Sequence, residues 1–173
     1  MPHSERPAPI SVGVLTISDK ASRGERDDLG GPTVREIVET VGGRIVESAI
    51  IPDERGEISA SIRRLADQCG VDLVLTTGGT GLARRDITPQ ATLDVIDYQV
   101  PGLAEAMRAA SLTKTPASML SRMVAGVRGR CLIVNLPGNP KGVRECLEVI
   151  LPALPHAVSL LRSEIGEHGR PER

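Results

Sequence analysis

The chain has 173 residues, and its 22 acidic and 21 basic side chains leave a formal charge of -1. The composition, 40% apolar and 25% charged, is that of an ordinary globular protein and excludes disordered, collagenous and coiled-coil classes. A single Tyr without Phe or Trp excludes an aromatic platform that stacks nucleic-acid bases. We therefore expect no nucleic-acid partner and one domain, residues 10–163, between flexible ends at 1–9 and 164–173.

The N-terminal half alternates strands with helices. Apolar and β-branched runs predict three strands, at 11–19, 44–52 and 71–77. Apolar residues at helical spacing predict the helices between them, at 32–41 and 57–69. Strands that alternate with helices of this length imply right-handed βαβ units and a sheet covered on both faces. The predicted fold class is therefore α/β, with three layers (α/β/α) and a mainly parallel sheet.

The C-terminal half continues with helices around a hairpin. Prolines in the first turn start predicted helices at 88–98 and 101–112, and residues 114–123 connect them to the next strands. The runs 124–127 and 131–136 predict a β-hairpin that feeds an inner strand. A further helix starts at Pro140 and is broken by Pro152, and a last helical piece runs to about Leu161.

The sequence carries few signals for membranes, zinc or redox chemistry. No apolar run approaches the roughly 20 residues that cross a bilayer, and the polar start lacks a leader, so we expect a cytoplasmic protein without membrane contact. Cys69, Cys131 and Cys146 are scattered among apolar residues, which favours small buried side chains over a disulfide or a zinc site. The histidines lie near the chain ends, which argues against a histidine-based catalyst.

Loops that follow strands carry the candidate site, because ligands of open parallel sheets bind at the carboxyl ends of the strands. In the most informative loop, Gly78, Gly79 and Gly81 follow an apolar strand, where the backbone can turn sharply and present N–H groups to an anion. Arg84-Arg85-Asp86 and a helix start at Thr88 come directly after them. The neighbouring cations and helix start favour a polyphosphate site over a purely structural turn.

Two carboxylates, Asp53 and Asp86, are the predicted metal ligands. Each lies in a loop after a parallel strand, and Mg²⁺ in nucleotide sites is typically held by one or two carboxylates with substrate phosphates. The alternative is that each Asp only bonds the backbone of its own turn. Lys141 lies in the first turn of a helix, where a cation opposes the helix dipole, so it meets either a phosphate or solvent. The residues thus predict a crevice for a nucleotide or polyphosphate.

One long run closely resembles the signature of the molybdenum-cofactor biosynthesis family. It comprises Leu75 to Gly81 followed by Ala83 to Thr92, and further matches occur at Ile17-Ser18-Asp19, Ile51 to Glu54, Pro101-Gly102, Met119 to Arg122 and Asn135 to Pro140. The resemblance covers about residues 11–161. Within the family the chain looks like the molybdopterin adenylyltransferases. The same domain type occurs in the N-terminal part of gephyrin and in plant molybdenum-cofactor proteins.

The resemblance implies a reaction and a set of roles. AMP is transferred from ATP to the terminal phosphate of molybdopterin, with release of pyrophosphate and with Mg²⁺ as cofactor. The substrate supplies the nucleophile, so positioning and charge neutralisation suffice. Asp53 and Asp86 would hold Mg²⁺, and the implied substrate-binding and nucleotide-binding residues are Ser18, Asp19, Gly78, Gly79, Thr80, Gly81, Ser121, Arg122, Asn135, Gly138, Asn139 and Pro140. A homotrimer and a molybdenum-insertion partner are also implied.

Three alternatives stay open at the level of sequence. Some similar relatives bind molybdopterin without adenylyltransferase activity, although Asp53 and Asp86 together with the Gly-rich loop favour activity. The comparison with gephyrin allows a trimeric scaffold or interaction module. A dinucleotide enzyme of the Rossmann type is disfavoured, because residues 18–24 lack G-x-G-x-x-G.

Overall fold

A computed structural model describes residues 8–167, with side chains for residues 8–163. Residues 1–7 and 168–173, which make up most of the two predicted flexible ends, lie outside the described residues. The last helix continues to Glu167, so it extends into the segment predicted as a tail.

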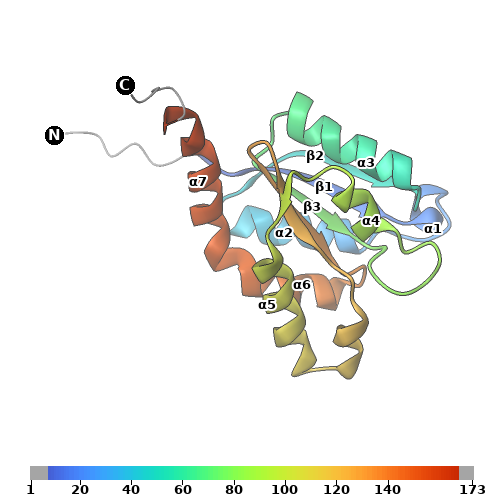
Figure 1. Cartoon of the computed structure of the whole chain (residues 1–173). Coiled ribbons are helices and arrows are strands. Elements are labelled where there is room, and N and C mark those ends of the chain that lie inside the picture. Colours follow the sequence, from blue (N-terminus) through green and yellow to red (C-terminus); the bar gives the residue numbers. More distant parts are fainter. Residues whose placement is uncertain (1–7, 168–173) are drawn as a thin grey trace.

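A six-stranded sheet forms the centre of the molecule, in the order β2-β1-β3-β6-β5-β4 (Figure 1). The pairs β2–β1, β1–β3 and β3–β6 are parallel. The pairs β6–β5 and β5–β4 are antiparallel and form one edge of the sheet. The strands are β1 (Ser11–Ile17), β2 (Arg44–Ile51), β3 (Leu73–Thr77), β4 (Tyr98–Gln99), β5 (Ala125–Arg128) and β6 (Cys131–Leu136). The predicted mainly parallel sheet and the hairpin of β5 and β6 are confirmed.

Helices cover both faces of this sheet. The helices α2, α5, α6 and α7 pack on one face, and α3 with α4 packs on the other, as the predicted three layers require. The helical elements are α1 (Asp19–Ser22), α2 (Gly30–Thr40), α3 (Arg55–Arg63), η1 (Arg64–Gln68), α4 (Thr88–Leu93), α5 (Pro101–Leu112), η2 (Pro116–Leu120), α6 (Pro140–Ile150), η3 (Leu151–Ala153) and α7 (Leu154–Glu167).

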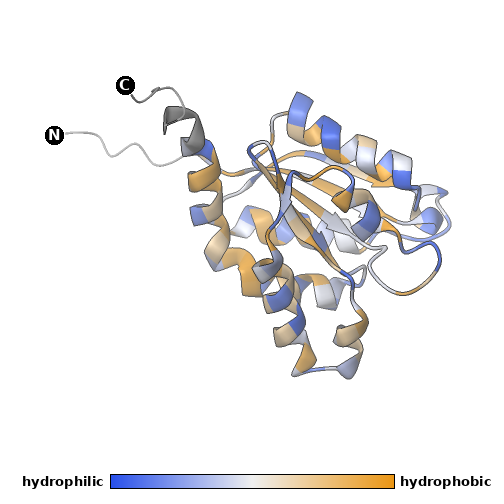
Figure 2. Cartoon of the chain, viewed as in Figure 1, coloured by the Kyte–Doolittle hydropathy of each residue, from blue (hydrophilic) through white to orange (hydrophobic). Residues whose placement is uncertain are grey.

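The central strands are apolar because both of their faces are covered. All residues of β1, β3 and β6 are buried, and alternate side chains of β1 enter separate cores. Val12 and Val14 pack with α2 and α6, whereas Leu15 and Ile17 pack with α3. Figure 2 shows the central strands as mostly apolar, while α3 alternates between apolar and polar residues, as expected for a helix that covers a core.

The structure differs most clearly from the sequence-based elements at three short segments. The helix predicted over 88–98 ends at Leu93, and the chain then pairs Tyr98 with Val127 to form β4. The predicted strand 11–19 stops at Ile17, because Ser18 caps the short helix α1 by accepting a hydrogen bond from the Ala21 amide. The connecting segment 114–123 contains η2. The partner of β4 lies far along the chain, so local periodicity does not reveal this strand.

One helical stretch, Pro140–Ser163, is long and apolar enough to cross a membrane by length and composition alone. This differs from the expectation that no run approaches that length. In the fold several of its apolar residues, among them Leu147, Ile150 and Leu154, pack into the core against the sheet. Val149 and Leu160 are exposed, and η3 interrupts the stretch at Pro152. The packing is that of helices covering a core, for which such length and composition are weak evidence of a membrane segment.

Candidate functional site

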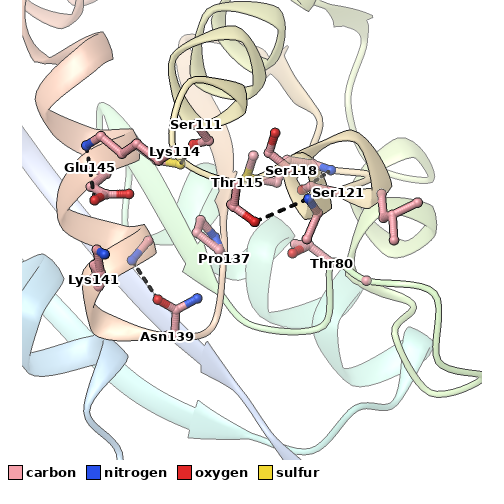
Figure 3. A pocket seen from close by; sticks show the side chains of 16 residues that line it. Thr80, Ser111, Lys114, Thr115, Ser118, Ser121, Pro137, Asn139, Lys141 and Glu145 are labelled. Atoms are coloured by element: carbon pink, nitrogen blue, oxygen red, sulfur yellow. Dashed lines mark hydrogen bonds and ion pairs between the residues drawn. The ribbon is translucent and has the colours of Figure 1, made fainter.

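Two adjoining cavities lie at the edge where the parallel strands end. The first, here called the acidic cavity, has a volume of about 670 Å³ and is lined by the carboxylates of Asp27, Asp28, Asp53 and Asp86. The second, here called the lysine cavity, has a volume of about 340 Å³ and is lined by residues of α5, η2 and α6 (Figure 3). Asn139 lines both, so the turn before α6 forms part of their common wall.

Most of the predicted site residues meet at these cavities. The acidic cavity is lined by Ser18, Asp53, Gly78, Gly79, Asp86, Gly138, Asn139 and Pro140. The lysine cavity is lined by Thr80, Gly81, Ser121 and Asn139, and also by Lys141. Three predicted residues line neither cavity: Asp19, Arg122 and Asn135.

Asp19 and Asp53 tie the loop after β1 to the loop after β2. The Asp19 amide donates to Asp53 Oδ2 at 2.8 Å, and the Asp53 amide donates to Asp19 Oδ1 at 3.0 Å. Arg85 donates to both carboxylate oxygens of Asp19, to the Asp53 carbonyl and to Glu54. The hydrogen bonds from Arg85 hold the pKa of Asp19 below its usual value. Asp19 is therefore engaged by protein groups and positions Asp53 from beside the cavity.

The two predicted metal ligands line the acidic cavity, and each uses one carboxylate oxygen in a hydrogen bond to the backbone. Asp53 Oδ2 is bonded to the Asp19 amide, and Asp86 Oδ2 accepts from the Ala83 amide at 2.9 Å. Within residues 8–163 the other oxygen of each carboxylate accepts no hydrogen bond. Burial raises the pKa of Asp53 above its usual value, and the charges of Asp19 and Asp86 raise it further. Asp86 thus bonds its own turn and Asp53 bonds the loop after β1, and each carboxylate still has one oxygen that accepts no hydrogen bond.

These carboxylates fit a divalent cation that is bound together with a substrate. No three His, Cys, Asp or Glu side chains gather as a metal site anywhere in the described part of the chain. Asp53 and Asp86 would therefore supply two ligands, with phosphate and water completing the shell, which is the usual arrangement for Mg²⁺. A cation there would also offset the repulsion that raises the pKa of Asp53.

The Gly-rich turn after β3 admits only glycine at its first two positions. Gly78 and Gly79 have φ angles of +101° and +65°, which L side chains rarely adopt. A Cβ on Gly78 would lie 2.3 Å from the Ile17 carbonyl oxygen, and a Cβ on Gly79 would lie 2.3 Å from Thr88 Oγ1. The turn can therefore pass close to β1 and α4 while lining the acidic cavity.

Arg122 and Asn135 hold loops and do not line the cavities. The Arg122 guanidinium donates to the carbonyls of Gly81 and Asp86, which fastens both ends of that loop. Asn135 is fully buried, and its Nδ2 donates to the hydroxyls of Thr76 and Thr92 while its Oδ1 accepts from the Val124 amide. Asn135 was expected to close a wall of the crevice; in the structure it lines neither cavity, and its polar atoms are satisfied inside the fold.

Several lining residues escaped the sequence analysis. Asp28 accepts hydrogen bonds from Thr16 Oγ1 and the Gly31 amide, so it fixes the start of α2 at the acidic cavity. The signal was present, because two aspartates precede a Gly-Gly-Pro helix start. Figure 3 shows Lys114 beside Glu145 in the lysine cavity, at an ion-pair distance of 3.0 Å. Lys114 lies in the segment predicted only as a connection.

Comparisons with known proteins show the family to which this chain belongs. A family model described as a probable molybdopterin binding domain matches residues 13–156. The chain is 46% identical over 154 residues to a molybdopterin adenylyltransferase of Helicobacter pylori, covering 88% of each. It is 44% identical over 146 residues to the enzyme of the same name from Escherichia coli, covering 83% of this chain and 75% of the other. The structure of the molybdopterin biosynthesis enzyme MoaB from Thermus thermophilus superposes with a TM-score of 0.85 at 53% identity, covering 90% of this chain and 98% of that one. The chain therefore belongs to the molybdenum-cofactor biosynthesis family of molybdopterin-binding domains.

Proposed function

We propose that the protein is a molybdopterin adenylyltransferase of molybdenum-cofactor biosynthesis, as its relatives are named. The observation that carries the proposal is the pair of cavities that share Asn139, one rich in carboxylates and the other containing Lys114 and Lys141. A reaction that joins two substrates through their phosphates requires adjoining sites of this kind. The acidic cavity takes Mg-ATP, and the lysine cavity takes molybdopterin.

The reaction needs no nucleophile from the protein. An oxygen of the terminal phosphate of molybdopterin forms a bond to the α-phosphorus of ATP, and pyrophosphate leaves with the electron pair of the broken P–O bond. Asp53 and Asp86 would hold Mg²⁺, which neutralises charge on the phosphates and the leaving group. The turns at Gly78 to Gly81 and Gly138 to Pro140 would bring the two phosphates together, with Ser18 beside them.

The proposed oligomeric state, location and partner protein rest on the family resemblance. We expect a homotrimer that acts in the cytoplasm and passes its product to a molybdenum-insertion protein. Light scattering on the purified protein measures the assembly directly, with a trimer expected at three times the chain mass of 18.3 kDa. A monomer in solution would contradict this part of the proposal.

The experiment that tests the activity combines purified protein with molybdopterin, ATP and Mg²⁺. Mass spectrometry follows adenylylated molybdopterin, and an enzymatic assay follows pyrophosphate. Product that disappears with EDTA and returns with excess Mg²⁺ supports the proposed metal-dependent transfer. Protein that binds molybdopterin but makes no product would favour a binding relative or a scaffold instead.

A further inference from the structure

Thr88 carries a buried hydroxyl that the fold leaves without a partner. Among the residues whose side chains are described, only Thr88 Oγ1 and Gln90 Oε1 are buried side-chain oxygens or nitrogens without a hydrogen bond. The exposed fraction of Thr88 is 0%. Because burying an unpaired hydroxyl costs its full desolvation, such groups in native proteins call for an explanation.

The hydroxyl lies near the oxygen of Asp53 that accepts no hydrogen bond. A Cβ placed on Gly79 would lie 2.3 Å from Thr88 Oγ1 and 3.1 Å from Asp53 Oδ1, so both oxygens border the same small space above Gly79. The Thr88 amide donates to the Gly79 carbonyl at 3.1 Å, which fixes the start of α4 to the Gly-rich turn. The side chain is therefore held beside the carboxylate by its own backbone.

Neighbouring threonines have hydroxyls that are hydrogen-bonded within the fold. Thr92 Oγ1 donates to the Thr88 carbonyl at 2.9 Å and accepts from Asn135 Nδ2 at 2.9 Å. Thr76 Oγ1 also accepts from Asn135, at 3.0 Å. Valine could supply the same shape as Thr88 without a buried polar atom, so packing does not account for the hydroxyl.

We propose that Thr88 is a positioning residue whose hydroxyl donates to Asp53 Oδ1 in the substrate complex, an inference that rests on the proposed function. Asp53 Oδ2 is already held by the Asp19 amide. A second donor at Oδ1 fixes the plane of the carboxylate, which a single hydrogen bond leaves free to tilt. The orientation fixed in this way is the one in which Asp53 meets the cation and the phosphates of Mg-ATP.

The test compares Thr88→Val with Thr88→Ser, and uses Thr92→Val as the matched control. Thr88→Val keeps the shape and removes only the unpaired hydroxyl, so its melting temperature should equal or exceed that of the wild type. Its kcat should fall about ten- to a hundredfold, as expected for a misplaced group, while the KM for molybdopterin changes less than about twofold. Thr88→Ser should restore most of kcat. Thr92→Val breaks two hydrogen bonds and should lower the melting temperature while retaining kcat below that temperature.

Calorimetry separates this inference from the proposed function. Thr88→Val should bind Mg-ATP about fivefold more weakly than the wild type and should bind ATP equally well in EDTA, because only the cation-dependent contact is lost. An unchanged kcat and Mg-ATP affinity in Thr88→Val, or a melting temperature that falls as in Thr92→Val, would overturn the positioning role. If the wild type makes no adenylylated product, the proposed function fails, and the Mg-ATP affinities alone decide the role of Thr88.

Discussion

The structure leaves room in one carboxylate for two roles, structural turn residue and metal ligand, which the sequence presents as alternatives. Asp53 and Asp86 each give one oxygen to a backbone amide and leave the other free. A carboxylate accepts several hydrogen bonds, so a turn residue and a metal ligand can be the same side chain. The question for each Asp is therefore which oxygen serves which role, and a substitution can separate the two.

Asp86→Asn should keep the conformation of the turn and lose most of the adenylyl-transfer activity. The amide oxygen of Asn can still accept from the Ala83 amide, so the melting temperature should stay within a few degrees. Loss of the charge should lower kcat for adenylyl transfer by roughly a hundredfold or more, because charge neutralisation acts in the transition state. Rate measurements with saturating substrates check this, and Asp86→Ala, which also loses the turn bond, is the comparison. Wild-type turnover in Asp86→Asn would contradict the metal-ligand role.

Asp72 shows a carboxylate with a purely structural role, at the opposite ends of the strands. Burial by itself would raise the pKa of Asp72, but hydrogen bonds from Arg162 and Ser11 outweigh it and lower the pKa to about 2. The folded-state pKa lies below the usual 3.8, so the stabilisation is complete above about pH 4 and is lost as the pH falls through about 2.

Asp72→Asn should accordingly lower the free energy of unfolding at pH 7 by an amount on the order of 2 kcal/mol. The difference from the wild type should shrink between about pH 4 and pH 2, because the wild-type carboxylate then takes up its proton. Urea unfolding at several pH values measures it. The control is Glu36→Gln, which removes an exposed ion pair with Arg144 and should cost less than about 1 kcal/mol. A pH-independent difference would show that charge is not the cause.

At the scale of elements, the loop from Gly81 to Asp86 contains neither helix nor strand and is held from two sides. The Arg122 guanidinium donates hydrogen bonds to the carbonyls at the two ends of the loop. Arg85, within the loop, donates to the carboxylates of Asp19 and Glu54. The planar guanidinium of Arg122 can donate to both carbonyls at once, which a lysine ammonium cannot reproduce. The order of this loop therefore depends on a residue outside it.

Arg122→Lys should loosen the loop without unfolding the domain. Trypsin should cleave after Arg84 and Arg85 faster than in the wild type, since the loop opens more often. The kcat/KM for ATP should fall about tenfold, because Asp86 loses its fixed position. Time-resolved proteolysis with mass spectrometry measures the first effect. Arg23→Lys, at an exposed pair with Glu25, should change neither quantity. Unchanged cleavage in Arg122→Lys would indicate that the loop is held by its other contacts.

Across the whole molecule, sheet order brings the site together. The strand order β2-β1-β3-β6 places the loops that contain Asp53, Asp19, Gly78 and Gly138 in one row along the same edge. Both faces of the sheet are filled by aliphatic cores, so these loops stand on a rigid support. The same packing separates the cysteines: Cys131 and Cys146 are buried, whereas Cys69 is exposed, contrary to the expectation of a buried side chain.

Thiol labelling should report this packing. In the native protein about one thiol per chain should react promptly, because Cys69 is exposed and burial raises the pKa of Cys131 to about 12. All three should react in guanidinium. A Cys69→Ser variant should then show almost no prompt reaction. Prompt labelling of Cys131 or Cys146 in the folded variant would mean that the core opens more readily than its packing implies.

The sequence by itself determined the strands β1, β2, β3 and β6, the hairpin, the Gly-rich turn and the pair Asp53 and Asp86. The strands and the turn are encoded locally. The doubly covered strands β1, β3 and β6 are apolar runs, the edge strand β2 alternates between exposed and half-buried residues, and a turn with positive φ requires glycine. Only the tertiary structure decided the rest. It paired β4 with a strand that is distant in sequence and placed Asp27 and Asp28 at the acidic cavity. It also buried the side chain of Asn135 and used Arg122 to hold the loop from Gly81 to Asp86. Whether a polar side chain meets a ligand or a neighbour depends on groups far along the chain, which local patterns do not record.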